Sequence, residues 1–118
     1  LVGSEMCIRD RGATFETSVL KWLRSIGLTA ERLSRAGSKD EGDIVVIVSG
    51  KNYILELKAT KKLDLPGFWE EATVEAENYA KARGLTAVPP AYVIVKRRQA
   101  SIEDAWVIQT LEKWIEQI

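Results

Sequence analysis

Residues 43–58 combine two strand patterns around a short turn, and this combination leaves few choices for the local fold. Residues 43–48 are almost wholly apolar and β-branched, which is typical of a strand covered on both faces. Residues 53–58 alternate between apolar and polar side chains. Because residues 49–52 (Ser-Gly-Lys-Asn) are a turn signal, the sequence predicts a β-hairpin.

The register of this hairpin would follow from a two-residue turn at residues 50–51. Counting back from that turn pairs Val45 with Glu56 and Asp43 with Lys58, provided that no bulge intervenes. Since side chains alternate along a strand, Glu56 and Lys58 share a face, and Asp43 lies on it about 5 and 7 Å from them. The sequence therefore predicts two carboxylates and one amine together on a single face.

An acidic residue two positions before a lysine is common on the solvent face of antiparallel strands, where opposite charges pair. Here the same face also carries Val45, Ile47 and Ile54, which are core-like residues. A charged end on an apolar face indicates a site at the rim of the sheet. Because two neighbouring carboxylates repel one another, and an oxygen-ligated divalent ion removes that conflict, we expect a metal site.

The kind of metal is limited by the ligands that this chain offers. It has no histidine and one cysteine, Cys7, so neither an ordinary zinc site nor a Ser-His triad can be assembled, and a metal would be Mg²⁺, Mn²⁺ or Ca²⁺. A bound Mg²⁺ can polarise a phosphoryl oxygen and activate water. Lys58 could orient that water or stabilise charge on phosphorus, so these groups suit phosphodiester hydrolysis.

The rest of the chain predicts helices and further strands around the hairpin. Periodicity and turn residues place them at 13–26 (helix), 28–35 (strand), 43–48 and 53–58 (hairpin), 68–83 (helix), 91–95 and 105–108 (strands), with a terminal helix at Leu111, Trp114, Ile115 and Ile118. The order α, β, β, β, α, β, β, α favours an α/β sandwich around a mixed sheet. A length of 118 residues fits one domain.

Several side chains allow two interpretations at this stage. Glu16 is in line with Leu20 and Leu23 and so borders the buried stripe of the first helix, but a boundary carboxylate that reaches water explains it equally well. The helix at residues 68–83 has an acidic outer face, which for most members we expect to be solvated: Glu70, Glu71, Glu75 and Glu77. The three tryptophans Trp69, Trp106 and Trp114 could be core or interface residues, and we expect most of them to lie in the core.

Basic and acidic residues balance at 17 each, so a nucleic-acid site must come from local clusters of Lys and Arg. Lys61 and Lys62 directly follow the strand that carries Lys58 and should lie near the proposed metal. A single surface Lys or Arg is usually only a solvated charge. The candidates for phosphate contacts are Arg11, Arg35, Lys39, Lys61, Lys62, Lys96, Arg97 and Arg98.

The first ten residues show no periodicity. Their Ser-Glu-Met-Cys-Ile-Arg-Asp run resembles translated sequencing-adapter sequence, so we expect residues 1–10 to be a non-native or disordered leader and residues 11–118 to form the domain. The apolar runs are far shorter than the roughly 20 residues that cross a bilayer, and no signal-peptide pattern opens the chain. These features, with a single cysteine, predict a soluble cytoplasmic protein.

The ordered set of Glu16, Asp43 after Gly42, and Glu56 two residues before Lys58 resembles the E…D…ExK pattern of the PD-(D/E)xK nuclease superfamily. Within that superfamily, residues 11–16 (Arg-Gly-Ala-Thr-Phe-Glu) and 34–38 (Ser-Arg-Ala-Gly-Ser) are similar to archaeal-type and phage-type Holliday junction resolvases. The resemblance spans about residues 11–98 and implies a restriction-endonuclease-like fold, a mixed β-sheet sandwiched by helices.

This resemblance also implies a function and a set of site residues. It implies a homodimer that cuts four-way DNA junctions with Mg²⁺, for which Mn²⁺ can substitute. Asp43 and Glu56 would be metal ligands joined by Glu16, the family's helix-one glutamate. Lys58 would act at the attacking water, and Ser38 would lie near the scissile phosphate.

The resemblance leaves the substrate open. Many relatives carry a Gln or Lys in a fourth motif, where the helix at residues 68–83 offers mainly glutamates. The alternatives are a general repair or restriction-type nuclease of the same superfamily and a catalytically silent DNA-binding module with the nuclease fold.

Overall fold

The computed structural model describes residues 11–33 and 40–118, except for the side chains of residues 11–13. The expected leader, residues 1–10, lies outside the described residues, as do Arg35, Ser38 and Lys39. Within the described part of the chain, no helix is both long and apolar enough to cross a lipid bilayer.

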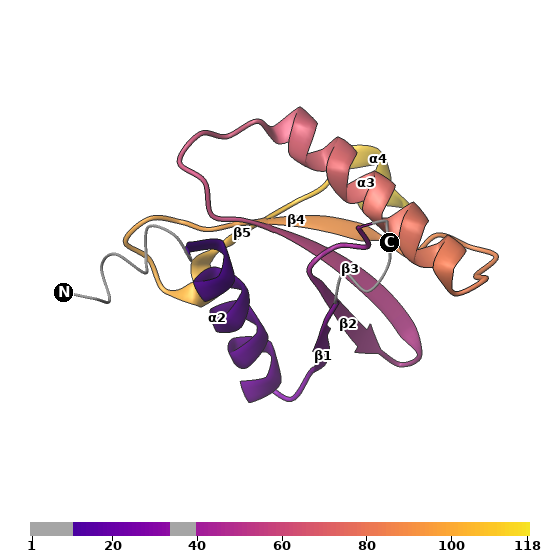
Figure 1. Cartoon of the computed structure of the whole chain (residues 1–118), viewed down its shortest axis with the longest axis horizontal. Helices are drawn as coiled ribbons and strands as arrows, with labels where there is room; N and C mark the ends of the chain where they lie inside the picture. The colour runs from indigo at the N-terminus through magenta and orange to yellow at the C-terminus, as the bar shows by residue number, and fades with distance from the viewer. Residues whose placement is uncertain (1–10, 34–39) are drawn as a thin grey trace.

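One five-stranded mixed sheet, ordered β1-β2-β3-β4-β5, forms the middle layer of the fold (Figure 1). Antiparallel pairing joins β1 to β2, β2 to β3, and β4 to β5, whereas β3 and β4 are parallel. The strands are β1 (Thr29–Arg32), β2 (Ile44–Val48), β3 (Lys51–Lys58), β4 (Ala91–Val95) and β5 (Trp106–Ile108). The helices are α2 (Arg11–Ser25), α3 (Leu65–Ala82) and α4 (Leu111–Glu116), with a 3₁₀ turn, η1, at Ile102–Asp104. This arrangement confirms the predicted order and the α/β sandwich.

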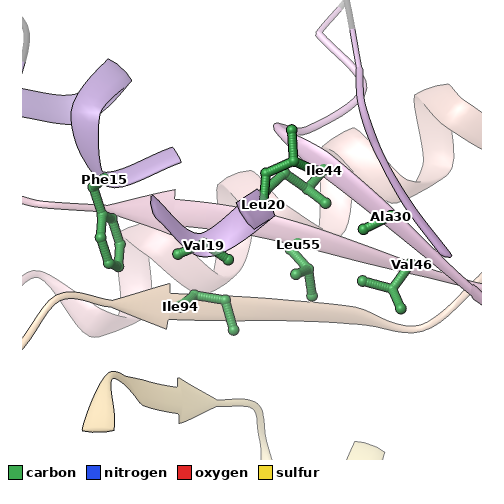
Figure 2. Close-up of a cluster of buried hydrophobic side chains, with 8 residues drawn as sticks. All are labelled: Phe15, Val19, Leu20, Ala30, Ile44, Val46, Leu55 and Ile94. Carbon is green, nitrogen blue, oxygen red and sulfur yellow. The ribbon is translucent and has the colours of Figure 1, made fainter. Parts of the chain in front are cut away.

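Helix α2 covers one face of the sheet. Phe15, Val19 and Leu20 project from it at helical spacing and are buried against side chains of β1 to β4 (Figure 2). The sheet contributes Ala30, Ile44, Val46, Leu55 and Ile94 to this cluster. The apolar stripe predicted for the first helix is therefore confirmed as one half of the core.

Helix α3 covers the opposite face, as the crossover between the parallel strands β3 and β4 (Figure 1). Ala72 and Ala76 are almost fully buried, and these small side chains let the helix approach Val45, Ile54 and Val93 closely. The face of β3 that carries Ile54, Glu56 and Lys58 is therefore the face beneath α3, so the charged end of β3 lies at the rim of a packed interface.

The predicted hairpin register is wrong by two residues. Val48 pairs with Lys51, so the turn consists of Ser49 and Gly50 instead of residues 50–51. A type I′ turn, one of the two-residue turns that match strand twist, has positive φ at both positions, and these two residues have φ of 51° and 79°. Because the shift is an even number of residues, every side chain keeps its predicted face.

The expectation that most of the three tryptophans are core residues is also wrong. Trp69 is partly buried against the α3-side cluster, but Trp106 and Trp114 are about half exposed, at 54% and 50%. Both lie in the last two elements, where β5 is an edge strand with one neighbour and α4 has only six residues. The apolar pattern at this end of the chain therefore marks a surface.

Gly42 provides a test of how the backbone enters β2. Its φ is +103°, and a Cβ there would lie 2.8 Å from Cγ2 of Ile54. We expect Gly42→Ala to lower the free energy of unfolding by roughly 2–4 kcal/mol, because left-handed strain and overpacking add. Gly50→Ala is the matched control, since φ there is +79° but the space is open, and about 1 kcal/mol is expected. Equal losses in urea titrations of the two variants would contradict the close approach.

Candidate active site and nucleic-acid interface

Glu56 and Lys58 lie near the carboxyl end of β3, beneath the first turns of α3. Glu56 is 5% exposed, although carboxylates are rarely buried without a partner. The Nζ of Lys58 lies 3.1 Å from Oε2 of Glu56 and donates to Oε1 of Glu71 at 2.6 Å. It also lies 5.1 Å from the centre of the Phe68 ring. Lys58 therefore bridges the strand and the helix instead of pointing into solvent.

Asp43 reaches this region from the start of β2. Its backbone N–H donates to the carbonyl of Leu55 at 3.0 Å, and its Oδ2 accepts from the N–H of Leu57 at 2.8 Å. Asp43 therefore lies beside residues 55–57. It does not lie opposite Lys58, where the register predicted from the sequence had placed it. The two acids predicted to converge are brought close together, and the charge of Asp43 helps to raise the pKa of Glu56.

Glu16 approaches the same region from α2. Its pKa is raised, chiefly by burial and then by the charge of Asp43, while Arg32 acts in the opposite direction. The Nε of Arg32 lies 3.9 Å from Oε2 of Glu16. Asp43 is thus within electrostatic range of both Glu16 and Glu56, but a shared role of the three as metal ligands stays a prediction.

Glu75 is the site residue that the sequence interpretation missed. It is only 2% exposed, whereas its neighbours Glu71 and Glu77 on α3 are exposed, so the expectation of a solvated acidic face holds for them and fails for Glu75. The signal was present in the spacing. Glu75 is three residues after Ala72 and four before Tyr79, which places it within the buried stripe.

Glu56 and Glu75 form a buried acidic pair. Burial, first of all, raises the pKa of both carboxyl groups. Hydrogen bonds to Glu56 and Asp40, and then the charges of these two residues, raise the pKa of Glu75 further, while the hydrogen bond to Glu75 and the contact with Lys58 lower the pKa of Glu56. For Lys58, burial lowers the pKa, but hydrogen bonds to Glu71 and Glu56 outweigh it and the pKa is raised. At neutral pH Lys58 is therefore a cation beside an acidic pair that retains a proton in the absence of metal.

Asp40, Glu71 and Glu75 form a compact group of three acids. One carboxylate oxygen from each lies within 4.8 Å of the others. Asp40 is oriented by its neighbours, since its Oδ1 accepts from the N–H of Gly42 at 3.1 Å and its carbonyl accepts from Nδ2 of Asn78 at 2.9 Å. This group and the Asp43–Glu56 region have oxygen donors only, which fits a hard divalent ion such as Mg²⁺.

Five basic side chains gather at the carboxyl ends of β3 and β4. The N–H of Lys96 donates to the carbonyl of Lys58 at 2.9 Å, which joins the two segments that leave these parallel strands. A hollow between them is lined by Lys61, Lys96, Arg97, Arg98 and Trp106 among others, and Lys62 is exposed beside it. Among the described residues, none of the five cations forms an ion pair.

Trp106 is a further residue of this surface that the sequence interpretation did not place there. The guanidinium of Arg97 lies 4.6 Å from the centre of its half-exposed indole. A cation over an aromatic ring, next to further cations, can contact both a phosphate and a base. Arg35 and Lys39 lie outside the described residues, and the side chain of Arg11 is not described.

The acidic pair predicts a pH-dependent effect of Glu75→Gln on stability. Below pH 4 the Glu75 carboxyl is protonated in both states. As the pH rises past 4.5, the usual pKa of this carboxyl group, the unfolded chain releases the proton while the folded chain holds it. The folded state therefore loses stability relative to the unfolded state. The side chain in the Glu75→Gln variant does not titrate, so it causes no such loss of stability as the pH rises. We expect Glu75→Gln to stabilise the metal-free protein at pH 8 by about 1–3 kcal/mol more than at pH 5.

Urea unfolding in EDTA at both pH values measures this difference. Glu77→Gln is the control, since it makes the same change at an exposed position of the same helix and should show no pH-dependent gain. An effect of Glu75→Gln that is the same at pH 5 and pH 8 would contradict the raised pKa.

Comparison with known proteins finds matches among solved structures. No protein-family model matches the chain, and no curated protein matches it. Among solved structures, the 1.6 Å structure of Hjc from Archaeoglobus fulgidus, a Holliday junction resolvase from an archaeal hyperthermophile, is 26% identical. The match covers 76% of this chain and 67% of that chain, with a TM-score of 0.51. The resemblance to archaeal-type resolvases is thereby confirmed, and this chain has the mixed α/β fold of that resolvase nuclease.

Proposed function

We propose that this chain is a Mg²⁺-dependent endodeoxyribonuclease that hydrolyses phosphodiester bonds in four-way DNA junctions. One observation carries the proposal: buried Glu56 and partly buried Lys58, with Asp43 beside them, lie at the end of β3 from which the basic surface begins. Acids that suit a metal and cations that suit phosphates are thus neighbours. The fold shared with a resolvase supports the same conclusion.

Asp43 and Glu56 would hold the metal, and Glu16 would join them from α2. Oε1 of Glu56 is buried and accepts no hydrogen bond from the described residues, so this oxygen is available to a cation. When bound, Mg²⁺ supplies a polarised phosphoryl oxygen and a water of lowered pKa. Lys58, held as a cation by Glu56 and Glu71, would orient the attacking water or stabilise negative charge on the phosphate.

The remaining assignments extend this proposal to the whole site. Ser38 would lie near the scissile phosphate, and Arg11, Arg35 and Lys39 would contact the DNA backbone together with the five cations of the basic surface. Residues 11–118 would constitute the nuclease domain.

A homodimer would explain symmetric cutting, because two strands of a junction require two sites. The apolar side chains exposed on β5 and α4 support this proposal, since exposed patches of this kind mark interaction surfaces. They are Val107, Leu111, Trp114, Ile115 and Ile118.

Cleavage assays with isosteric variants test the enzymatic claim. With Mg²⁺ or Mn²⁺ and a labelled four-way junction, we expect Asp43→Asn and Glu56→Gln each to reduce the cleavage rate roughly 100-fold or more while junction binding persists, since metal ligation is lost but shape is kept. Glu77→Gln is the matched control and should cleave like the wild type.

The substrates separate the alternatives in the same experiment. Paired symmetric nicks in the junction, with linear duplex and single strand intact, are the expected result. Cutting of plain duplex would instead indicate a repair or restriction-type nuclease. Junction binding without cleavage in either metal ion would show a silent DNA-binding module and overturn the enzymatic claim.

The basic surface predicts a change in the salt dependence of binding. We expect Lys61→Ala and Arg98→Ala each to weaken junction binding and to reduce the slope of log K against log salt by about one, because each removes one phosphate contact. Lys51→Ala is the control, since Lys51 is exposed at the opposite end of β3. Fluorescence anisotropy across salt concentrations measures the slopes, and equal slopes for all three variants would exclude this surface from the interface.

A further inference from the structure

We propose that Asp40, Glu71 and Glu75 form a second divalent-cation site, separate from the position flanked by Asp43 and Glu56. The three carboxylates each place one oxygen within 4.8 Å of the others. The inference goes beyond the proposed nuclease function and does not depend on cleavage. Its basis is the geometry of α3 and of the segment that leads into β2.

Glu75 is the observation that points to a ligand. Both of its carboxylate oxygens are buried, and among the described residues neither accepts a hydrogen bond from an N–H group or from a Ser, Thr or Tyr hydroxyl. Its neighbours are other carboxyl groups, those of Glu56 and Asp40. A buried carboxylate without a donor is costly, and a cation placed among these oxygens would satisfy it.

Lys58 pairs with one acid of each group but leaves Glu75 without a counter-charge among the described ion pairs. Its Nζ is within 3.1 Å of Glu56 and 2.6 Å of Glu71, and no ion pair joins it to Glu75. Among the described carboxylates, Arg83 forms an ion pair only with Glu41, at 3.1 Å. Among the described ion pairs, one lysine therefore serves Glu56 and Glu71 while Glu75 lies between them unpaired, and a divalent cation would offset the excess negative charge of these three carboxylates.

The three ligands are held in place before any ion binds. Glu71 and Glu75 are four residues apart on α3, so they lie on the same side of the helix. Asp40 is tied to that helix through its carbonyl, which accepts from Asn78, and its side chain is oriented by the N–H of Gly42. A preorganised set of this kind loses little entropy on binding.

The chemistry of the ligands also indicates which kind of ion fits. One oxygen of each carboxylate lies within 4.8 Å of the others, and the ligands are carboxylate oxygens alone, which suits hard divalent cations such as Mg²⁺, Mn²⁺ and Ca²⁺.

Counting bound Mn²⁺ on the whole chain, without DNA, tests the second site. Electron paramagnetic resonance titrations should give two ions per chain for the wild type and one for Glu75→Gln, with Glu71→Gln weakening the same ion at least tenfold. Asp43→Asn should lose the other ion, and the double variant Asp43→Asn/Glu75→Gln should bind none. Glu77→Gln, an exposed change on the same helix, should keep both, and circular dichroism should confirm that each variant is folded.

The outcomes separate this inference from the proposed function. Unchanged Mn²⁺ binding in folded Glu75→Gln and Glu71→Gln would overturn the second site and leave Glu75 as a buried protonated acid. A single wild-type ion that only Asp43→Asn removes would overturn it as well. If Glu75→Gln removes an ion and Asp43→Asn removes none, the second site stands and the metal role of Asp43 in the proposed nuclease fails. Addition of Ca²⁺ should displace the Mn²⁺ that depends on Glu75.

Discussion

The contact between two buried glutamates, Glu56 of β3 and Glu75 of α3, governs the chemistry of this protein. Two carboxyl groups in a poorly solvated interface cannot both be ionised without a counter-charge, so the pair must keep a proton or gain a cation. Lys58 is the nearby cation among the described residues, and it is shared with Glu71. The packed interface between β3 and α3 therefore ends in an acidic pair, and the protonation of this pair depends on whether a cation is bound.

The parallel pairing of β3 and β4 explains why acids and bases meet at one edge. Parallel strands end at the same side of a sheet, and the hydrogen bond from Lys96 to Lys58 joins the two segments that follow them. Glu56 and Lys58 of β3 lie beneath α3, and the cations of the basic surface lie in the segments that follow β3 and β4. Electrically neutral overall, the chain can still present a cationic surface next to an acidic one.

Local patterns predicted most of the elements because each pattern depends on near neighbours. The apolar spacing of α2, the β-branched run of β2 and the alternation of β3 all correspond to observed elements. The faces of Glu56 and Lys58 were also predictable, because face depends only on parity along a strand. The register was not, since Ser49 has few sequence signals for the positive φ that it adopts.

Sequence alone determined the oxygen-only ligand chemistry, the order of elements and the shared face of Glu56 and Lys58, since composition and short-range periodicity are properties of the chain itself. Tertiary structure decided that Glu75 is buried against Glu56, that Asp40 joins Glu71 and Glu75, and that Trp106 belongs to the basic surface. Those contacts join α3 to the sheet, the segment before β2 to α3, and β5 to the loop after β4. They depend on how distant elements pack, which periodicity along one element does not encode.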